Sequence, residues 1–279
     1  MHITCWGSRG SIPVSGKEFI KYGGDTTCIE IRTKTDEIII VDAGTGIRRL
    51  GNFLVEENRF NYNLLFTHAH WDHVIGLTAF KPLFMDKTQL TVYRCPFPGK
   101  YIENMLATVM KPPNFPVRYS DLRATINYVD SCPATFQIGP VTVEPIPLNH
   151  PDSGCGYKFT ENGCTFVFLT DNELTYAHPG GLSRTDYLQF CKGADLLFHD
   201  AEYTPTEYRH KQGWGHSYYT DVLELAMAAG VKNLGLFHIN SERTDSDMDV
   251  IVEKCQELIR ENNSSLNCFA AGCNTSFSL

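Results

Sequence analysis

The stretch "THAHWDHVIGL" (residues 67–77) holds three histidines and one aspartate in six consecutive positions, namely His68, His70, Asp72 and His73. Histidine is otherwise scarce, with ten in 279 residues. Side chains of this kind, crowded together, would repel one another when protonated or compete for hydrogen-bond partners. A metal ion removes that conflict, because neutral imidazole nitrogens and carboxylate oxygens all donate electron pairs to it. The stretch therefore predicts a metal centre.

The residues before the cluster indicate how it is presented. The apolar run "NLLFT" (63–67) predicts a buried strand that carries the cluster at its C-terminal end. In an extended chain, residues two apart point to the same side, so His68 and His70 can face one ion. A turn after the strand then brings Asp72 and His73 round to the same place.

Four neighbouring ligands are too few to complete two coordination spheres, so further ligands must come from elsewhere in the chain. Three polar residues each follow an apolar run: His150 after "VTVEPIPLN", Asp171 after "CTFVFLT" and His238 after "VKNLGLF". Proteins of the α/β class place their chemistry at such strand ends. Asp42, at the end of "EIIIVD", is expected to support the site by accepting a hydrogen bond from a ligand imidazole.

Short apolar runs and amphipathic stretches alternate along the chain in a pattern that favours a layered α/β sandwich over an all-parallel doubly wound sheet. Strands are expected at 2–6, 27–33, 37–43, 63–67, 90–94, 141–147, 155–160, 164–170, 194–198 and 232–237. Helices are expected at 44–57, 183–192, 219–229 and 245–262. No repeat or linker divides the chain, so a single domain over residues 1–279 is expected.

Composition indicates the cellular compartment in which the protein is expected. No apolar run approaches the roughly 20 residues that span a bilayer, and the opening "MHITCWGSRGS" lacks the order of a signal peptide. We therefore expect a cytoplasmic protein without membrane association. Its ten cysteines are scattered and include no Cys-x-x-Cys pair, so they are expected to be reduced thiols that fill the core. A homodimer is compatible with the sequence.

Charge is distributed unevenly along the chain. The net charge of −8 argues against a surface built throughout for nucleic acid, yet Lys81–Arg123 carries seven basic and three acidic residues. Within it, residues 95–121 are rich in proline and aromatic residues and are expected to form an insertion or cap over the site. The alternative is an ordinary solvated surface. Candidates for substrate contacts in this segment are Tyr101, Phe115 and Tyr119 for stacking, and Lys100, Lys111 and Arg118 for phosphate oxygens.

The pattern H-x-H-x-D-H, followed by distant His, Asp and His, resembles the metallo-β-lactamase-fold hydrolases. The resemblance runs along the chain through "WGSRGS" (6–11), "YGGDTTCIEI" (22–31), "VDAGTGIR" (41–48) and "LFHINSERT" (236–244). The sequence is most similar to the phosphodiesterase branch, which includes ribonuclease Z and cyclic-nucleotide phosphodiesterases. The resemblance implies a four-layer αββα sandwich with a dinuclear site along one edge.

The resemblance also implies a ligand assignment for two divalent metal ions. One ion is held by His68, His70 and His150, the other by Asp72, His73 and His238, and both by the bridging Asp171. Histidine-rich spheres with carboxylates favour zinc, while manganese and iron are compatible with the same ligand types.

Two further stretches match the ribonuclease Z pattern. "LLFHDAEY" (196–203) falls where that family has a His-Glu-Ala-Thr motif, and "GWGHSYY" (213–219) matches its Gly-His-Ser element. By this resemblance Asp200 orients His216, which protonates the leaving oxygen. Asp72, besides binding metal, can accept a proton from the nucleophile. Aspartate in place of glutamate shortens the reach of residue 200 by one methylene group.

The expected function is a dinuclear metal-dependent hydrolase, a phosphodiesterase acting on a cyclic nucleotide or another small phosphodiester. The alternatives are a ribonuclease Z-like RNA endonuclease, a lactone, thioester or β-lactam hydrolase, and a non-hydrolytic binding or redox protein. Asp200 and His216 favour phosphodiester chemistry, because acyl hydrolysis gains less from a dedicated acid for the leaving group. The lack of a long Gly/Pro-tipped arm for transfer RNA favours a small substrate.

Overall fold

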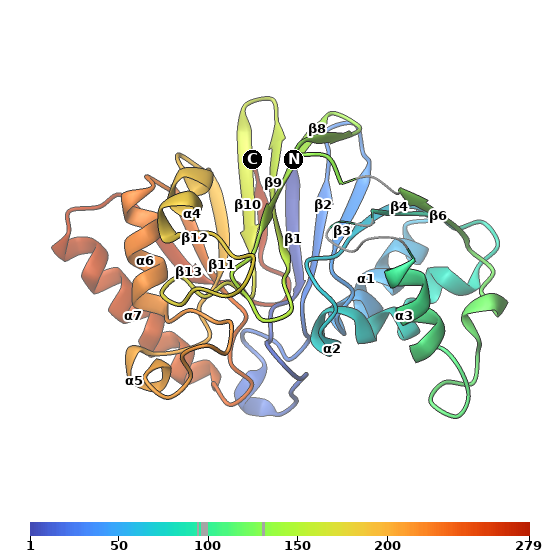
Figure 1. Ribbon diagram of the computed structural model, residues 1–279, viewed down its shortest axis with the longest axis horizontal. Helices are drawn as coiled ribbons and strands as arrows, with labels where there is room; N and C mark the ends of the chain where they lie inside the picture. Colours follow the sequence, from blue (N-terminus) through green and yellow to red (C-terminus); the bar gives the residue numbers. More distant parts are fainter. Residues whose placement is uncertain (94, 96–99, 130–131) are drawn as a thin grey trace.

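The computed structural model describes residues 1–93, 95, 100–129 and 132–279. These residues form two seven-stranded sheets that face each other, and helices cover the outer face of each sheet (Figure 1). The arrangement is the four-layer αββα sandwich, so the expected fold class is confirmed. No helix in the described part of the chain is long and apolar enough to cross a membrane.

Each sheet is antiparallel over one half and parallel over the other. The first sheet runs in the order β14 (Ser276–Ser278), β1 (His2–Gly7), β2 (Cys28–Arg32), β3 (Ile38–Val41), β4 (Asn61–Leu65), β5 (Gln89–Tyr93) and β6 (Thr125–Val129). The second sheet runs β13 (Asn267–Ala270), β12 (Asn233–Phe237), β11 (Leu196–Asp200), β10 (Cys164–Leu169), β9 (Cys155–Glu161), β8 (Val141–Pro147) and β7 (Phe136–Ile138).

The helices divide between the two outer faces. Against the first sheet lie α1 (Gly46–Glu56), α2 (Trp71–Val74) and α3 (Tyr101–Val109). Against the second lie α4 (Arg184–Cys191), α6 (Tyr219–Ala228) and α7 (Asp245–Glu261), and the short α5 (Pro205–Tyr208) follows β11.

Alternation along β3 shows why the layers form. Ile39 and Val41 lie in the core between the two sheets, whereas Ile38 and Ile40 lie in the core beneath α1. Successive side chains of a strand point to opposite faces, so a strand that is apolar at every position must be covered on both sides. A third core lies between the second sheet and its helices.

The expected helices and strands are present with ends shifted by a few residues. The strand expected at 90–94 is β5, and residue 94 lies outside the described residues. Four short strands were not expected, namely β6, β7, β13 and β14. Part of the segment expected to be irregular, 95–121, forms α3, and its residues 96–99 also lie outside the described part.

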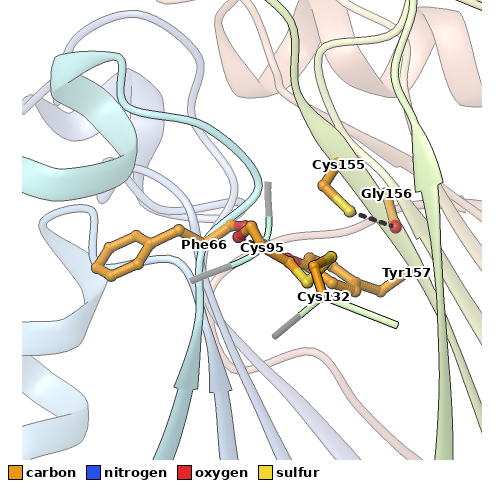
Figure 2. The surroundings of a disulfide bond; sticks show 6 residues. All are labelled: Phe66, Cys95, Cys132, Cys155, Gly156 and Tyr157. Atoms are coloured by element: carbon orange, nitrogen blue, oxygen red, sulfur yellow. Dashed lines mark hydrogen bonds between the residues drawn. A yellow bond between two sulfur atoms is a disulfide. The ribbon is translucent and has the colours of Figure 1, made fainter. Parts of the chain in front are cut away.

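The expectation that all cysteines are reduced is wrong for one pair. Cys95 and Cys132 form a disulfide with their Cα atoms 5.2 Å apart (Figure 2). The hydroxyl of Tyr157 donates to the carbonyls of Phe66, at 2.7 Å, and of Cys95, at 3.2 Å. The other eight cysteines, all in the described part, are free. Spacing alone could not reveal the pair, because the fold brings together residues 37 positions apart.

Candidate metal centre

The predicted site residues meet at one edge of the sandwich. His68, Asp171 and His238 come just after β4, β10 and β12, and the neighbouring strands β10, β11 and β12 are parallel. Strands β8 and β10 are both antiparallel to β9, so they run in the same direction and place His150 at this edge too. Because parallel strands end at one edge of a sheet, residues distant in sequence converge there.

The seven side chains expected to bind metal form two groups that share Asp171. Within each group, one potential ligand atom per residue lies within 4.8 Å of the others. The first group is His68, His70, His150 and Asp171, and the second is Asp72, His73, His238 and Asp171. His70 is exposed and the other six are buried, so the centre opens to solvent beside His70.

The distances between these atoms match the distances between two ligand atoms of one metal ion. His70 Nδ1 lies 3.2 Å from His150 Nε2, and Asp171 Oδ1 lies 3.2 Å from His73 Nε2. His238 Nε2 is 3.3 Å from Asp171 Oδ2. Two nitrogen ligands of a tetrahedral zinc ion, each about 2.0–2.1 Å from it, lie roughly 3.3 Å apart.

Two buried nitrogen atoms need an electron-pair acceptor. Nε2 of His68 and Nε2 of His73 have no hydrogen-bond partner among the described residues. A buried polar atom without a partner is costly, and each of these atoms points into one of the two ligand groups. A divalent cation in each group would accept these lone pairs, so the residues present fit the metal centre that the sequence predicts.

Hydrogen bonds at the far side of the imidazoles hold the ligand atoms in place. Three rings have Nδ1 against an acceptor, which holds a proton there and directs Nε2 toward the ligand groups. The pairs are His73 with Asp42 at 2.8 Å, His150 with the Gly215 carbonyl at 3.0 Å, and His238 with Glu202 at 3.0 Å. Asp42 thus accepts the hydrogen bond expected of it. Burial lowers the pKa of His68, and it lowers the pKa of His150 to about 3.

The centre carries an excess of negative charge. Five buried carboxylates surround it: Asp42, Asp72, Asp171, Asp200 and Glu202. In the described part of the chain, their ion-pair partners are histidines alone. Buried charges require compensation, and cations bound in the two groups would supply it.

Unusual backbone conformations orient these side chains. Asp42, Asp171 and His238 have φ values of 62°, 49° and 54°, in the left-handed region that non-glycine residues rarely adopt. Gly215 has φ of 92°, and a Cβ atom there would lie 2.0 Å from His150 Nδ1. A Cβ atom on Gly10 would lie 2.3 Å from His238 Nδ1. Only glycine permits these two close approaches.

A histidine–aspartate pair lies directly beside the second group. His216 Nδ1 donates to Asp200 Oδ2 at 2.6 Å, so the shorter aspartate side chain does reach the ring. The ring of His216 stacks on that of His238, with centroids 4.6 Å apart. Burial disfavours its charged form, but Asp200 and Glu202 outweigh burial and raise the pKa of His216 to about 9. The two carboxylates therefore favour the protonated form of the ring.

Two further acidic residues shape the site and were not anticipated. Glu202 holds the ring of His238 and also accepts from the Asn240 amide at 3.0 Å. Glu202 lies within the stretch "HDAEY", so its closeness to Asp200 was the available signal. Glu173 follows Asp171 by two residues and is fully buried, and nothing in the sequence singles it out.

The expected cap only partly approaches the site. Helix α3 faces α2 across a cavity, whereas Lys111 and Arg118 line a different cavity. Tyr119 forms a hydroxyl–hydroxyl hydrogen bond with Tyr128 and packs against the core beneath α1.

The fold and the two ligand groups define a metal-dependent hydrolase of the metallo-β-lactamase fold, as expected. The model of the beta-lactamase superfamily domain matches residues 38–239. The chain therefore belongs to the beta-lactamase superfamily.

Relatives with known names are distant. A ribonuclease Z of Bacteroides fragilis is 22% identical over 258 residues, which cover 76% of this chain and 83% of that protein. A ribonuclease Z of Exiguobacterium sibiricum is 24% identical over 234 residues, covering 71% of this chain and 77% of that protein.

Solved structures share the fold along the whole chain. The metallo-beta-lactamase fold protein YhfI of Bacillus subtilis has a TM-score of 0.72 at 15% identity, covering 99% of this chain and 98% of that one. A diphosphatase of the PhnP family has a TM-score of 0.68 at 16% identity, covering 100% and 97%. Zn(2+)-bound PqqB of Methylobacterium extorquens has a TM-score of 0.67 at 16% identity, covering 100% of both chains.

Proposed function

We propose that the protein is a phosphodiesterase with two divalent metal ions, and that it hydrolyses a small phosphodiester such as a cyclic nucleotide. The observation that carries the proposal is the Asp200–His216 pair, which sets an imidazole held through Nδ1 beside the second ligand group. Phosphodiester cleavage expels an alkoxide, which needs a proton. The names of the two ribonuclease Z relatives support phosphodiester cleavage, and the name of the diphosphatase supports hydrolysis at phosphorus.

Seven residues would hold the ions, as the resemblance implies: His68, His70 and His150 the first, Asp72, His73 and His238 the second, and Asp171 both. When bound, two divalent ions supply positive charge for the phosphate oxygens and lower the pKa of water. The number of imidazoles favours zinc, and the zinc-bound structural neighbour supports it.

Two side chains of the protein would donate and accept the protons of the reaction. His216 keeps Nδ1 on Asp200, so its Nε2–H is available to the leaving oxygen as a general acid. Asp72 would accept a proton from the attacking water. One of its oxygens already accepts a hydrogen bond from the backbone N–H of Ser11 at 2.8 Å, which fixes its orientation.

Substitution of His216 tests the proposal. His216→Ala should keep the bound metal and slow turnover about 10²- to 10⁴-fold on phosphodiesters with poor leaving groups. Substrates that release nitrophenolate should slow much less, because that group leaves without a proton. His210→Ala, at an exposed histidine, is the matched control. An equal loss on both kinds of substrate would show that His216 is not the acid.

Cleavage of RNA is the second candidate, and the names of the sequence relatives favour it. A substrate panel separates the candidates: cyclic nucleotides, bis-p-nitrophenyl phosphate, precursor transfer RNA, a lactone and nitrocefin. We expect the highest kcat/KM among the biological substrates on a cyclic nucleotide. Faster cleavage of precursor transfer RNA would favour the ribonuclease, and activity confined to the lactone or nitrocefin would contradict both.

A further inference from the structure

A cavity of about 350 Å³ lies between α2 and α3, next to the loop that carries His70. Ala69 and Trp71 form part of its wall, and these are the two chain neighbours of His70. His70 is the one exposed member of the two ligand groups. Two residues of the cavity wall are thus joined through the chain to the exposed ligand candidate.

Helix α3 supplies the opposite wall, through Tyr101, Asn104, Met105 and Thr108. The cavity thus lies between the helix that carries the metal motif and the helix of the insertion, which stand side by side in Figure 1. Substrate bound at the centre and in this cavity would contact both elements at once.

The lining of the cavity is aromatic and apolar. Trp71 is 60% exposed and Tyr101 is 49% exposed, so solvent reaches two large ring systems there. Asn104 adds an amide that can donate and accept hydrogen bonds. Thr108 donates its hydroxyl proton to the backbone carbonyl of Asn104 at 2.8 Å, which leaves the hydroxyl oxygen as an acceptor. Ring faces and an amide are the groups by which proteins stack a base and read its edge.

The volume of the cavity and the absence of charge among its described lining residues restrict the kind of ligand it can bind. Small-molecule sites in proteins have volumes of about 300–1,000 Å³, so this cavity suits one nucleoside and not a folded RNA. None of the described residues that line it carries a charge. An uncharged ring system fits such a wall, while the phosphate would remain at the metal centre.

We propose that this cavity is a base pocket, which binds the nucleobase of a mononucleotide substrate whose phosphodiester lies at the metal centre. The proposal rests on the proposed function and names the substrate class for it. Trp71 and Tyr101 supply the stacking faces, and Asn104 contacts the edge of the base.

Binding of nucleosides tests the pocket without any turnover. Thr108→Phe fills the cavity from α3, and Trp71→Ala removes a stacking face. Ala107→Phe is the matched control, because Ala107 is an exposed residue of the same helix that lines a different cavity.

Equilibrium dialysis with adenosine, guanosine, cytidine and uridine should show saturable binding of at least one of them to the wild-type protein and to Ala107→Phe. Thr108→Phe and Trp71→Ala should each weaken it about tenfold or more. The absence of binding to the wild-type protein, or unchanged binding to both pocket variants, would overturn the proposal.

Turnover gives a second and separable readout. In Thr108→Phe, kcat/KM should fall about tenfold for a 3′,5′-cyclic nucleotide and stay unchanged for methyl riboside 3,5-cyclic phosphate, which has no base. An equal fall for both substrates, or a fall for neither, would contradict the base pocket. If the wild-type protein hydrolyses neither, the phosphodiesterase proposal fails, and nucleoside binding still decides the pocket.

Discussion

Glu173 is a fully buried carboxylate that accepts four hydrogen bonds. Its donors are the Tyr208 hydroxyl at 2.6 Å, the Gly213 N–H at 2.7 Å, the Gly215 N–H at 2.8 Å and His178 Nε2 at 2.7 Å. Gly215 in turn accepts from the ring of His150 and precedes His216. Glu173 thus fixes the loop that positions both a metal-ligand candidate and the proposed acid.

Replacement of Glu173 should therefore destabilise the fold. In Glu173→Gln, the amide nitrogen must face a backbone N–H of Gly213 or Gly215, which leaves a buried donor unpaired. We expect the free energy of unfolding to fall by about 1–3 kcal/mol, measured by denaturant titration. Glu224→Gln, at a side chain that is 70% exposed, should change it little. Equal stability of the Glu173 variant and the wild type would contradict this role.

His199 makes stability depend on pH. Its Nδ1 donates to the Asp200 carbonyl at 2.8 Å and its Nε2 accepts from the Asn172 amide at 3.2 Å, so the ring is bound in its neutral form. Burial lowers the pKa of His199 to about 4, against 6.5 as its ordinary value. Between these values the unfolded chain binds a proton that the folded chain does not, so stability falls as the pH falls.

The contribution of His199 is measurable as a slope. Between about pH 6.5 and pH 4, His199 should change the free energy of unfolding by as much as about 1.4 kcal/mol per pH unit. His199→Asn should show a correspondingly shallower loss of stability in denaturant titrations across that window. His210→Asn, at the exposed histidine, should keep the wild-type slope. Parallel curves for wild type and His199→Asn would refute the assignment.

Residues of the site could be predicted to different extents. His68, His70, Asp72 and His73 are recognisable because ligands adjacent in sequence leave a pattern in it. The supporting carboxylates cannot be recognised in this way, since their partners are distant along the chain. Glu202, for example, meets a ring 36 positions away.

At the scale of helices and strands, the sequence predicted the centre of each sheet better than its edges. The four strands that were not expected, β6, β7, β13 and β14, are the four edge strands of the two sheets. An edge strand has one neighbour and buries less of its surface, so its apolar pattern is weaker. The central strand β3, by contrast, is buried at all four positions. Helix α3 was missed because the prolines around it suggested an irregular segment.

The disulfide ties the end of β5 to the chain that enters β7 and closes a loop that contains α3. Non-reducing peptide mapping should recover Cys95 and Cys132 in one linked peptide pair, with the other eight cysteines open to alkylation after denaturation. Closing a loop of this length typically stabilises a protein by about 2–4 kcal/mol, so Cys95→Ser should lower the free energy of unfolding by a similar amount. Ten reactive thiols in the unreduced protein would contradict the pairing.

At the scale of the whole molecule, each half of the sandwich supplies part of every ligand group. The first half carries the motif that follows β4, and the second supplies His150, Asp171 and His238 after β8, β10 and β12. An ion in either group would therefore link the two halves.

Metal should accordingly stabilise the whole fold. A ligand that binds only the folded state raises stability with its concentration, so dialysis against a chelator should lower Tm and added zinc should restore it. Magnesium, which prefers oxygen ligands and its own hydration shell, should restore it poorly. An unchanged Tm after verified metal removal would show that the centre does not join the halves.

The most direct test of the dinuclear centre is the metal content of the gently purified protein and of its Asp171→Ala variant. Elemental analysis should find about two divalent ions per wild-type chain. Because Asp171 is the one residue shared by both ligand groups, the variant should lose both ions together. A wild-type protein without metal whose activity metal does not restore, or a variant that loses only one ion, would contradict the account.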